Sequence, residues 1–227
     1  MMADPQSAYT PTKRTIPARK PERLSYDVAA VNAVLDEALV CHVGYQVDGI
    51  PAMIPTLHAR IGDQLYIHGS TGSRLMRAAG ENGIPLCICV TIADGLVMAR
   101  SWFNHSVNFR SVIIHGDAVV VTDKDEKWDA MVALMEHVAQ GRAEGSRSAN
   151  KREFAATAML RIPLVEVSLK MRSGPPGDDE EDLELPHWAG VLPMETVFGD
   201  PISACDAPVP AYIAEHQRSK RLSEVGD

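Results

Sequence analysis

The sequence has no long apolar run, and this absence limits what the protein can be. No stretch of its 227 residues approaches the roughly 18 consecutive apolar residues that a membrane helix needs. No apolar core follows the basic residues near the N-terminus, so the sequence shows no secretory signal. We therefore expect a protein that makes no membrane contact and is located in the cytoplasm.

Basic residues are too few to balance the acidic ones. The chain has 22 Lys and Arg against 30 Asp and Glu, which gives a formal net charge of -8. Nucleic acid is not expected as a partner, because its phosphates repel an acidic protein. One basic pocket can still hold a single phosphate group.

Cysteine is rare, and several catalytic motifs are missing. The four cysteines stand at positions 41, 87, 89 and 205. Cys87 and Cys89 alternate along an apolar run and are expected to be small core residues; without further ligands at close spacing, no metal site is expected. The sequence contains no G-x-G-x-x-G, Walker or serine-nucleophile motif, so the common sites built on those loops are not expected.

The chain is long enough to bury one substantial core. Residues 1–23 are rich in Pro, Thr, Lys and Arg and are predicted to form an extended arm. Residues 24–172 carry the periodic apolar pattern of a folded domain. Residues 173–227 are rich in proline, include an acidic run at 178–182, and are predicted to form an extension that packs on the domain or on a dimer.

Short apolar runs separated by turn signals predict an antiparallel β protein with a few helices. Helical spacing indicates a helix over 28–39, capped by Ser25 or Asp27, and another from Asp123 towards Gly141 with Trp128 and Met135 among its apolar positions. Residues 145–152 are predicted to form a polar connector. Asp48-Gly49 and Asp94-Gly95 are hairpin signals. The predicted strands are 41–47, 50–60, one ending near Ile67, 85–92, 96–101, a central one at 110–121, and 158–170. This order favours an antiparallel barrel with helices outside it.

The stretch 64–77 is the most informative part of the chain. A buried strand ends after Ile67, the small residues at 69–72 make a turn, and Ser73 begins a helical pattern that carries Arg74 and Arg77. Hydroxyl groups, free backbone N–H groups and arginines at such a junction suit the phosphate of a nucleotide or flavin. An ordinary strand–turn–helix with Ser73 as N-cap explains the same pattern.

Three segments together resemble the pyridoxamine 5'-phosphate oxidase-like flavin proteins. These segments are Ile-Pro-Ala-Met-Ile-Pro at 50–55, Tyr-Ile-His at 66–68 followed by Gly-Ser-Arg at 72–74, and Arg-Ser-Val-Ile-Ile-His-Gly at 110–116. His68 and the tail segments at 170–176 and 188–190 resemble the subgroup related to 5-nitroimidazole-resistance proteins. The resemblance implies a mainly β fold, an antiparallel Greek-key split β-barrel, which binds FMN and forms a homodimer with FMN at the subunit interface.

The chain departs from the true oxidases of that family in three places. Thr56 and Leu57 stand where those enzymes have a lysine, and Leu75 replaces the lysine of the phosphate clamp. The C-terminal Arg-x-His that holds a pyridoxal substrate is missing. Oxidation of pyridoxamine 5'-phosphate is therefore not expected.

The resemblance and the residue chemistry together give a set of cofactor-binding residues. Arginine and hydroxyl groups are expected to bind the phosphate, and apolar side chains with nearby backbone amides are expected to face the flavin ring. Asn108, with His105, is expected to reach the pocket from the partner subunit. The residues predicted to bind the cofactor are Met53, Ile54, Pro55, Ile67, His68, Gly69, Ser70, Ser73, Arg74, Asn108, Arg110 and Ser111.

His68 is the predicted catalytic residue, and three roles stay open for it. Its imidazole can hydrogen-bond the flavin edge, donate a proton to a substrate, or bind a haem iron. A histidine at the barrel rim with a structural role explains it as well. The first functional hypothesis is an FMN-dependent oxidoreductase that reduces a small molecule with electrons from a nicotinamide donor. The alternatives are a non-enzymatic flavin-binding or storage protein, and a haem-binding protein that uses His68.

Overall fold

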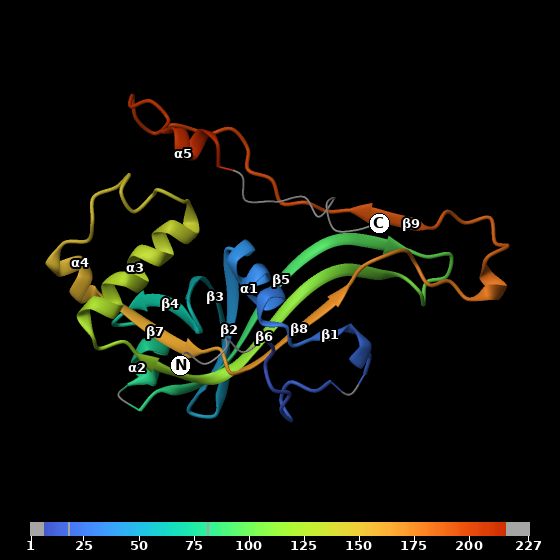
Figure 1. Cartoon of the computed structure of the whole chain (residues 1–227), viewed down its shortest axis with the longest axis horizontal. Helices are drawn as coiled ribbons and strands as arrows, with labels where there is room; N and C mark the ends of the chain where they lie inside the picture. Colours follow the sequence, from blue (N-terminus) through green and yellow to red (C-terminus); the bar gives the residue numbers. More distant parts are fainter. Residues whose placement is uncertain (1–6, 18, 81, 217–227) are drawn as a thin grey trace.

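The computed structural model describes residues 7–17, 19–80 and 82–216, and an antiparallel sheet dominates it (Figure 1). The strands are β1 (Leu24–Ser25), β2 (Val40–Val47), β3 (Ile50–Ile61), β4 (Gln64–Ser70), β5 (Ile84–Met98), β6 (Ser106–Val120), β7 (Thr157–Pro163), β8 (Glu166–Arg172) and β9 (Gly190–Pro193). Their order is β1-β8-β6-β7-β4-β3-β2-β5-β9, and a further pairing of β5 with β6 closes the sheet into a barrel. The predicted fold class, a mainly β antiparallel split barrel, is confirmed.

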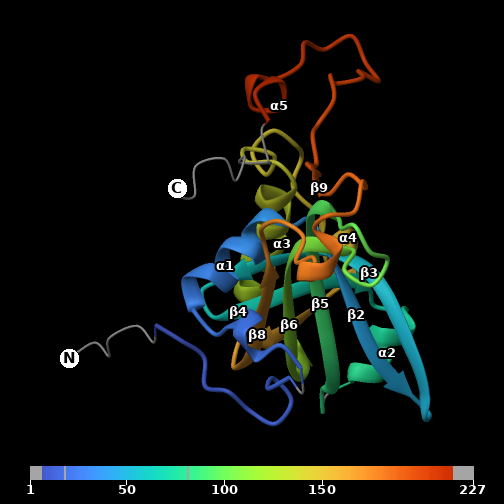
Figure 2. The same ribbon diagram turned by 90° about the vertical axis from the view of Figure 1, so that its right-hand side faces the viewer.

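The helices lie around this barrel (Figure 2). They are α1 (Val28–Glu37), α2 (Arg74–Ala79), α3 (Lys124–Val138), α4 (Lys151–Ala156) and α5 (Ala211–Ala214), with short 3-10 turns η1 (Pro21–Arg23) and η2 (Glu180–Asp182). Asp27, one of the two predicted caps, caps α1, and Asp123 caps α3: their carboxylates accept hydrogen bonds from first-turn N–H groups. Among the described residues, no helix combines the length and apolar character needed to cross a bilayer. The cytoplasmic location stays a prediction.

Two hydrophobic clusters hold the fold together. The larger fills the barrel, where Leu65, Ile88 and Ile114 are fully buried and α1 closes one end with Leu35. The smaller lies between α3 and the sheet and includes Leu134. Tyr9, from the predicted N-terminal arm, is also buried in the larger cluster. The domain boundaries at 23 and 172 stay a prediction.

The first three barrel strands follow the predicted hairpins, and their register leaves an opening. Asp48 and Gly49 adopt positive φ angles of 54° and 76° in the β2–β3 turn, and Gly62 adopts 60° in the β3–β4 turn. The β3–β4 ladder begins at Ile61 and Gln64 but ends at His58 and Ile67. Beyond that point β3 pairs with β2 and β4 pairs with β7. The facing edges of β3 at 55–57 and β4 at 68–70 are therefore split apart.

The hairpin predicted at Asp94-Gly95 is wrong. β5 runs straight through these residues to Met98, with only a register shift against β6 between Ala93 and Gly95. A Cβ atom on Gly95 would lie 3.1 Å from the Leu192 carbonyl oxygen, since β9 crosses close to this point. The glycine therefore allows a strand to approach and does not mark a turn.

The segment predicted as one strand over 158–170 is two strands. β7 ends at Pro163 and β8 begins at Glu166, and the break is held by the Leu164 N–H donating to the Asp63 carbonyl. β8 lies between β6 and β1, so it is not an edge strand. The polar connector predicted at 145–152 ends in helix α4, whose capping box joins Asn150 and Glu153.

The prediction that Cys87 and Cys89 are core residues is wrong. Cys87 and Cys89 share one face of β5, as expected, but that face is the outer one, where Cys87 is exposed. In the register of the sheet, Cys87 lies between Gly44 of β2 and His115 of β6. The two thiols are therefore surface groups of the barrel wall, because strand alternation directs Leu86 and Ile88 inward.

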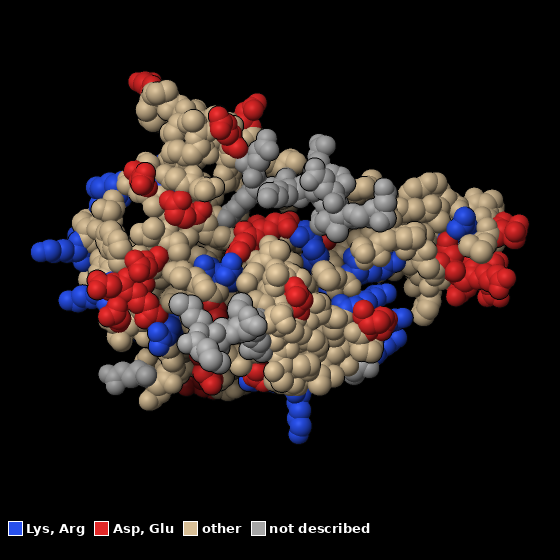
Figure 3. Space-filling view, in the orientation of Figure 1, with Lys and Arg blue, Asp and Glu red and all other residues tan. Residues whose placement is uncertain are grey.

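The C-terminal extension is anchored to the long β5–β6 hairpin. Arg100 pairs with the Asp178 carboxylate at 2.6 Å, and the Asp178 side chain is only 3% exposed. The Arg100 backbone N–H and guanidinium keep the pKa of Asp178 below its usual range. Figure 3 shows the acidic side chains gathered at the far end of this hairpin. β9 then pairs along β5 before the chain runs back across the molecule to α5 (Figure 1).

Candidate functional site

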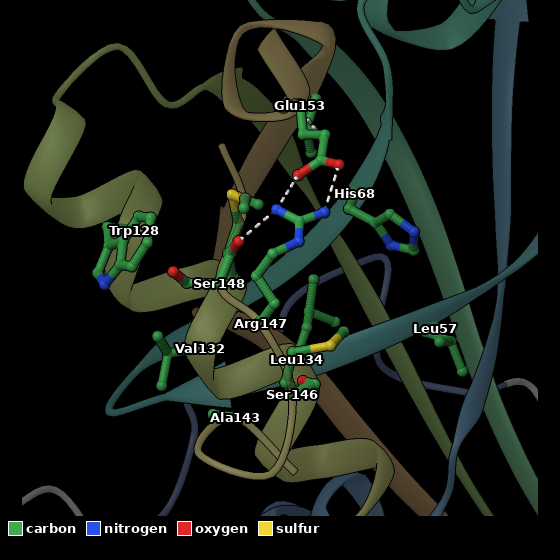
Figure 4. Close-up of a pocket in the computed structure, with 14 residues that line it drawn as sticks. Leu57, His68, Trp128, Val132, Leu134, Ala143, Ser146, Arg147, Ser148 and Glu153 are labelled. Atoms are coloured by element: carbon green, nitrogen blue, oxygen red, sulfur yellow. Dashed lines mark hydrogen bonds and ion pairs between the residues drawn. The ribbon is translucent and has the colours of Figure 1, made fainter. Parts of the chain in front are cut away.

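A cavity of about 380 Å³ lies between α3, β4 and the loop that leads into α4 (Figure 4). Its size is within the range of small-molecule and cofactor sites. Leu57 of β3 and His68 of β4 form one side, and apolar side chains of α3 form another. The loop over 143–149 and Glu153 of α4 complete the wall. Most of the lining is apolar, with a few polar groups placed within it.

Helix α3 turns a second apolar face towards this cavity. Ala130 and Leu134 are buried against the sheet, which explains why the helix packs there. Trp128, Val132 and Met135 recur at helical spacing on a different face, are 38%, 37% and 41% exposed, and line the cavity. The apolar pattern of this segment therefore serves both the core and a ligand site, although it predicted the core alone.

His68 reaches the cavity because of strand alternation. Its neighbour Ile67 is fully buried in the barrel, so the next side chain along β4 points outward. The backbone of His68 is fixed opposite Met159 of β7, and its imidazole is exposed at the cavity wall (Figure 4). An imidazole at the edge of an apolar cavity can hydrogen-bond a ligand, move a proton or bind a metal in a cofactor.

The charged groups of the cavity wall compensate each other. The Arg147 guanidinium donates two hydrogen bonds to the Glu153 carboxylate, at 2.7 and 3.0 Å, and a third to the Ser148 carbonyl at 2.8 Å. Glu153 also accepts from the Asn150 N–H at 2.8 Å. These bonds, first the one from Arg147, lower the pKa of Glu153 to about 2. The carboxylate is therefore ionised at neutral pH and orients Arg147 along the wall.

The Arg147–Glu153 pair is expected to survive mild acid. Because the pKa of Glu153 is lowered on folding, the pair stabilises the fold above the ordinary pKa of a glutamate and loses this effect as the pH falls through about 2. The carboxyl ¹³C signal of Glu153 should titrate near that value. In the Arg147→Ala variant the midpoint should rise towards the ordinary value, and an unchanged midpoint would show that Arg147 is not the cause.

The β4–α2 corner lies at the split between β3 and β4. Ser73 caps α2 by accepting a hydrogen bond from the Met76 N–H at 3.3 Å, as the alternative interpretation predicted. Ser70 accepts from the Gly72 N–H at 3.2 Å. Gly69 lacks a side chain where Met76 packs, since a Cβ atom there would lie 2.8 Å from the Met76 methyl group. The turn is thus shaped by local hydrogen bonds, and α2 is only 6 residues long.

Two cations are available at this corner. Arg74 and Arg77 are exposed on α2, and neither forms a salt bridge within the part of the chain that the structure describes. The buried residues of α2, including Leu75 and Met76, fix the helix on the barrel. Unpaired guanidinium groups beside strand edges that lack a ladder partner fit an anionic ligand with a flat polar ring.

The predicted residues of β3 and β4 differ in how exposed they are. Met53 is 67% exposed and Pro55 is exposed, whereas Ile54 is half-buried. Ile67 is fully buried, so only its backbone can reach a ligand. The free edge at 68–70 brings His68, Gly69 and Ser70 to the split, with Ser73 and Arg74 following in the chain.

The predicted cofactor-binding residues of β6 do not lie at the β4–α2 corner of this protomer. Arg110 sits between two carboxylates, with Nη1 at 2.5 Å from Glu37 and Nη2 at 2.8 Å from Asp94. These bonds raise its pKa, so its charge is already balanced. Asn108 is buried and bonded to Arg172 and the Gly174 carbonyl, and Ser111 contacts the Thr91 hydroxyl at 3.0 Å. β6 meets β7 only at Val119 and Val120, at its other end.

The sequence interpretation missed part of the cavity. The sequence predicts a helix with Trp128 and Met135 among its apolar positions and a polar connector over 145–152, and it assigns neither segment to a site. The sequence did contain a signal for the cavity: α3 has more apolar positions than the one face that packs on the sheet needs. No signal in the sequence pairs Arg147 with Glu153, except that Asn150 and Glu153 have the spacing of a capping box.

Comparisons with known proteins agree with this geometry. The family model described as "Pyridoxamine 5'-phosphate oxidase" matches residues 27–171. No curated protein matches the sequence significantly. Among solved structures, a flavocytochrome from Azotobacter vinelandii is 37% identical, with a TM-score of 0.83, and the match covers 92% of this chain and 99% of that one.

Two further solved structures are similar. An FAD and haem binding protein from Mycobacterium smegmatis is 35% identical, with a TM-score of 0.79, over 84% of this chain and 95% of that one. A protein described as a candidate 5-nitroimidazole antibiotic resistance protein, from Bacteroides thetaiotaomicron, is 19% identical with a TM-score of 0.55, over 65% and 85%. The third likeness concerns the fold alone. The resemblance inferred from the three sequence segments is confirmed.

Proposed function

Because this chain belongs to the pyridoxamine 5'-phosphate oxidase family, we propose that it binds a flavin at the β4–α2 corner and acts as an oxidoreductase. The observation that carries the proposal is the presence of Arg74 and Arg77, which form no salt bridge with any described residue, beside the split edges of β3 and β4. The guanidinium groups suit a flavin phosphate, and the free backbone groups suit the polar edge of its ring. The two relatives above 30% identity, a flavocytochrome and an FAD and haem binding protein, support the cofactor class.

We propose FMN as the flavin, as the sequence motifs imply. Releasing the cofactor from the purified protein by heat and identifying it by chromatography and mass tests this choice. Recovery of FMN supports it. Recovery of FAD, the flavin named for the M. smegmatis relative, would overturn the choice of FMN but keep the flavin site.

The proposed reaction takes electrons from a nicotinamide donor to a small molecule. A bound flavin supplies the electron transfer itself. Arg74 would hold the phosphate, and His68, at the same free edge of β4, would be the group that holds or donates a proton. Pyridoxamine 5'-phosphate is not the proposed substrate, because Thr56, Leu57 and Leu75 replace the family's lysines.

Anaerobic mixing with NADH or NADPH separates this enzyme from a flavin-storage protein. Bleaching of the flavin spectrum, followed by recovery on addition of a quinone or nitroaromatic acceptor, supports the oxidoreductase. A flavin that stays oxidised with both donors favours storage. Free flavin at the same concentration is the control for direct reduction in solution.

A second candidate function is haem binding in the cavity beside His68. The observation that favours it is an imidazole at the wall of an apolar cavity of about 380 Å³ lined by Trp128 and Met135. Such a lining would suit a flat apolar ring, and His68 would be the residue that holds its iron. The flavocytochrome and the FAD and haem binding protein support it by analogy.

We also propose a homodimer with the flavin at the subunit interface. The outer face of the central strands carries Met53, Gly44, Cys87 and His115 in one row across the sheet, and Met53 and Cys87 are exposed. An exposed sheet face of this composition suits a second copy of the chain. It would also explain why the residues predicted on β6 lie apart from the corner in one protomer. A monomeric mass by light scattering would contradict the proposal.

A further inference from the structure

The C-terminal segment returns to the loop that walls the cavity. After β9, the chain runs back over the molecule, and Figures 1 and 2 both place α5 beside the loop that follows α3. Tyr212 of α5 is half-buried there, although the segment around it is largely exposed. A residue from the far end of the sequence therefore contacts the part of the chain over 141–149 that shapes the cavity.

Two glycines of the loop make room for the Tyr212 ring. A Cβ atom on Gly145 would lie 2.1 Å from the phenol oxygen, and one on Gly141 would lie 3.3 Å from the ring carbon Cγ. Both glycines therefore leave the space that the ring occupies. The Arg142 Nη1 donates a hydrogen bond to the phenol oxygen at 3.1 Å. The contact combines ring packing on two glycines with a charge-assisted hydrogen bond.

The two halves of the loop are held in different ways. Glu136 of α3 accepts hydrogen bonds from the N–H groups of Gly141 at 2.7 Å and Ala143 at 2.9 Å, which fixes the first half to its own helix. The second half begins at Gly145, where Tyr212 packs. Ser146, immediately after it, lines the cavity. The Gly145 N–H also donates to the Gly141 carbonyl at 3.0 Å, and Arg147 pairs with Glu153, so the Tyr212 contact adds to the bonds that position this wall.

We propose that Tyr212 is a positioning residue, which holds the 141–149 loop as a wall of the cavity and so slows the loss of the cavity's ligand. The effect on the ligand rests on the second candidate function, haem binding beside His68. The position of the loop itself does not depend on that function. The C-terminal segment thereby becomes part of the site, although none of its described residues, which end at position 216, lines the cavity.

Hydrogen exchange on the full chain tests the position of the loop without any ligand. Tyr212→Ala removes the ring, and Gly145→Ala fills the space that it occupies. Both variants should exchange the amides of 145–149 about tenfold faster than the wild type, since a ring contact and one hydrogen bond are lost. Tyr212→Phe should recover most of the protection. Ile202→Ala, at a residue of the same segment that is 97% exposed, is the matched control.

Haemin is the probe for the second part of the proposal. Its transfer from the loaded protein to apomyoglobin should be about tenfold faster in Tyr212→Ala and Gly145→Ala, and unchanged in Ile202→Ala. Two results would overturn the proposal. One is wild-type amide exchange in both Tyr212→Ala and Gly145→Ala; the other is an unchanged haemin transfer rate in these variants when the wild type does bind haemin. If the wild-type protein binds no haemin, the haem candidate fails, and the exchange experiment alone decides the role of Tyr212.

Discussion

Replacing Arg74 and Arg77 together by alanine is expected to weaken flavin binding roughly a thousandfold. Each guanidinium offers charge-assisted hydrogen bonds to a phosphate, and such bonds are worth about 1.5–3 kcal/mol each. The structure gives these cations no competing carboxylate among the described residues, so a phosphate would receive their full interaction. Fluorescence titration of the apoprotein with FMN, in which bound flavin is distinguished from free flavin, measures the loss.

A single variant and a control variant show how much of the loss of flavin affinity comes from Arg74. Arg74→Ala alone should weaken binding by roughly ten- to a hundredfold, because one cation remains. Arg152→Ala, at an exposed arginine of α4 outside both candidate sites, should bind FMN like the wild type. A thermal melt of each apoprotein shows whether the fold is intact. Unchanged FMN affinity in the double variant would remove the β4–α2 corner as the phosphate site.

Replacing His68 by alanine is expected to weaken haem binding at least about a hundredfold. The apolar face of α3 can still contact the ring, but the iron loses the imidazole that the cavity wall provides. Titration of the apoprotein with haemin, followed in the visible spectrum, measures the affinity and shows whether the spectrum of an imidazole-ligated iron is lost. His187→Ala, at an exposed histidine of the C-terminal extension, is the matched control.

The same variant decides between the roles that were left open for His68. Loss of haem with normal flavin content identifies His68 as an iron ligand. Loss of flavin reduction or retention, with no haem bound by the wild type, identifies it as a residue of the flavin site. Normal haem binding, flavin content and turnover in His68→Ala would leave it as a rim histidine with a structural role.

Much of the barrel could be predicted because its early turns are made by local chemistry. The turns at Asp48-Gly49 and Gly62 require positive φ angles, and residue types that tolerate such angles indicate these turns in the sequence. Asp94-Gly95 has the same letters, but a strand that arrives from residues 190–193 decides its conformation. A local signal cannot show that kind of long-range contact.

The candidate sites were predictable to different degrees for a similar reason. The corner at Ser73 and Arg74 is continuous in sequence, so one stretch shows both the turn and its charges. The cavity is assembled from β3, β4, α3 and the loop before α4, and only His68 was identified in advance. The ion pairs of Arg110 with Glu37 and Asp94 likewise join three separate elements. The motif predicted a free arginine there because its partners are distant in sequence.

The pairing of β9 with β5 also has a consequence for synthesis. Gly95 pairs with Pro193, so β5 leaves the ribosome long before the strand that covers its outer edge has been made. An uncovered edge can recruit a strand from another chain. The end of β5 therefore stays uncovered during synthesis until residues 190–193 have left the ribosome and paired with it.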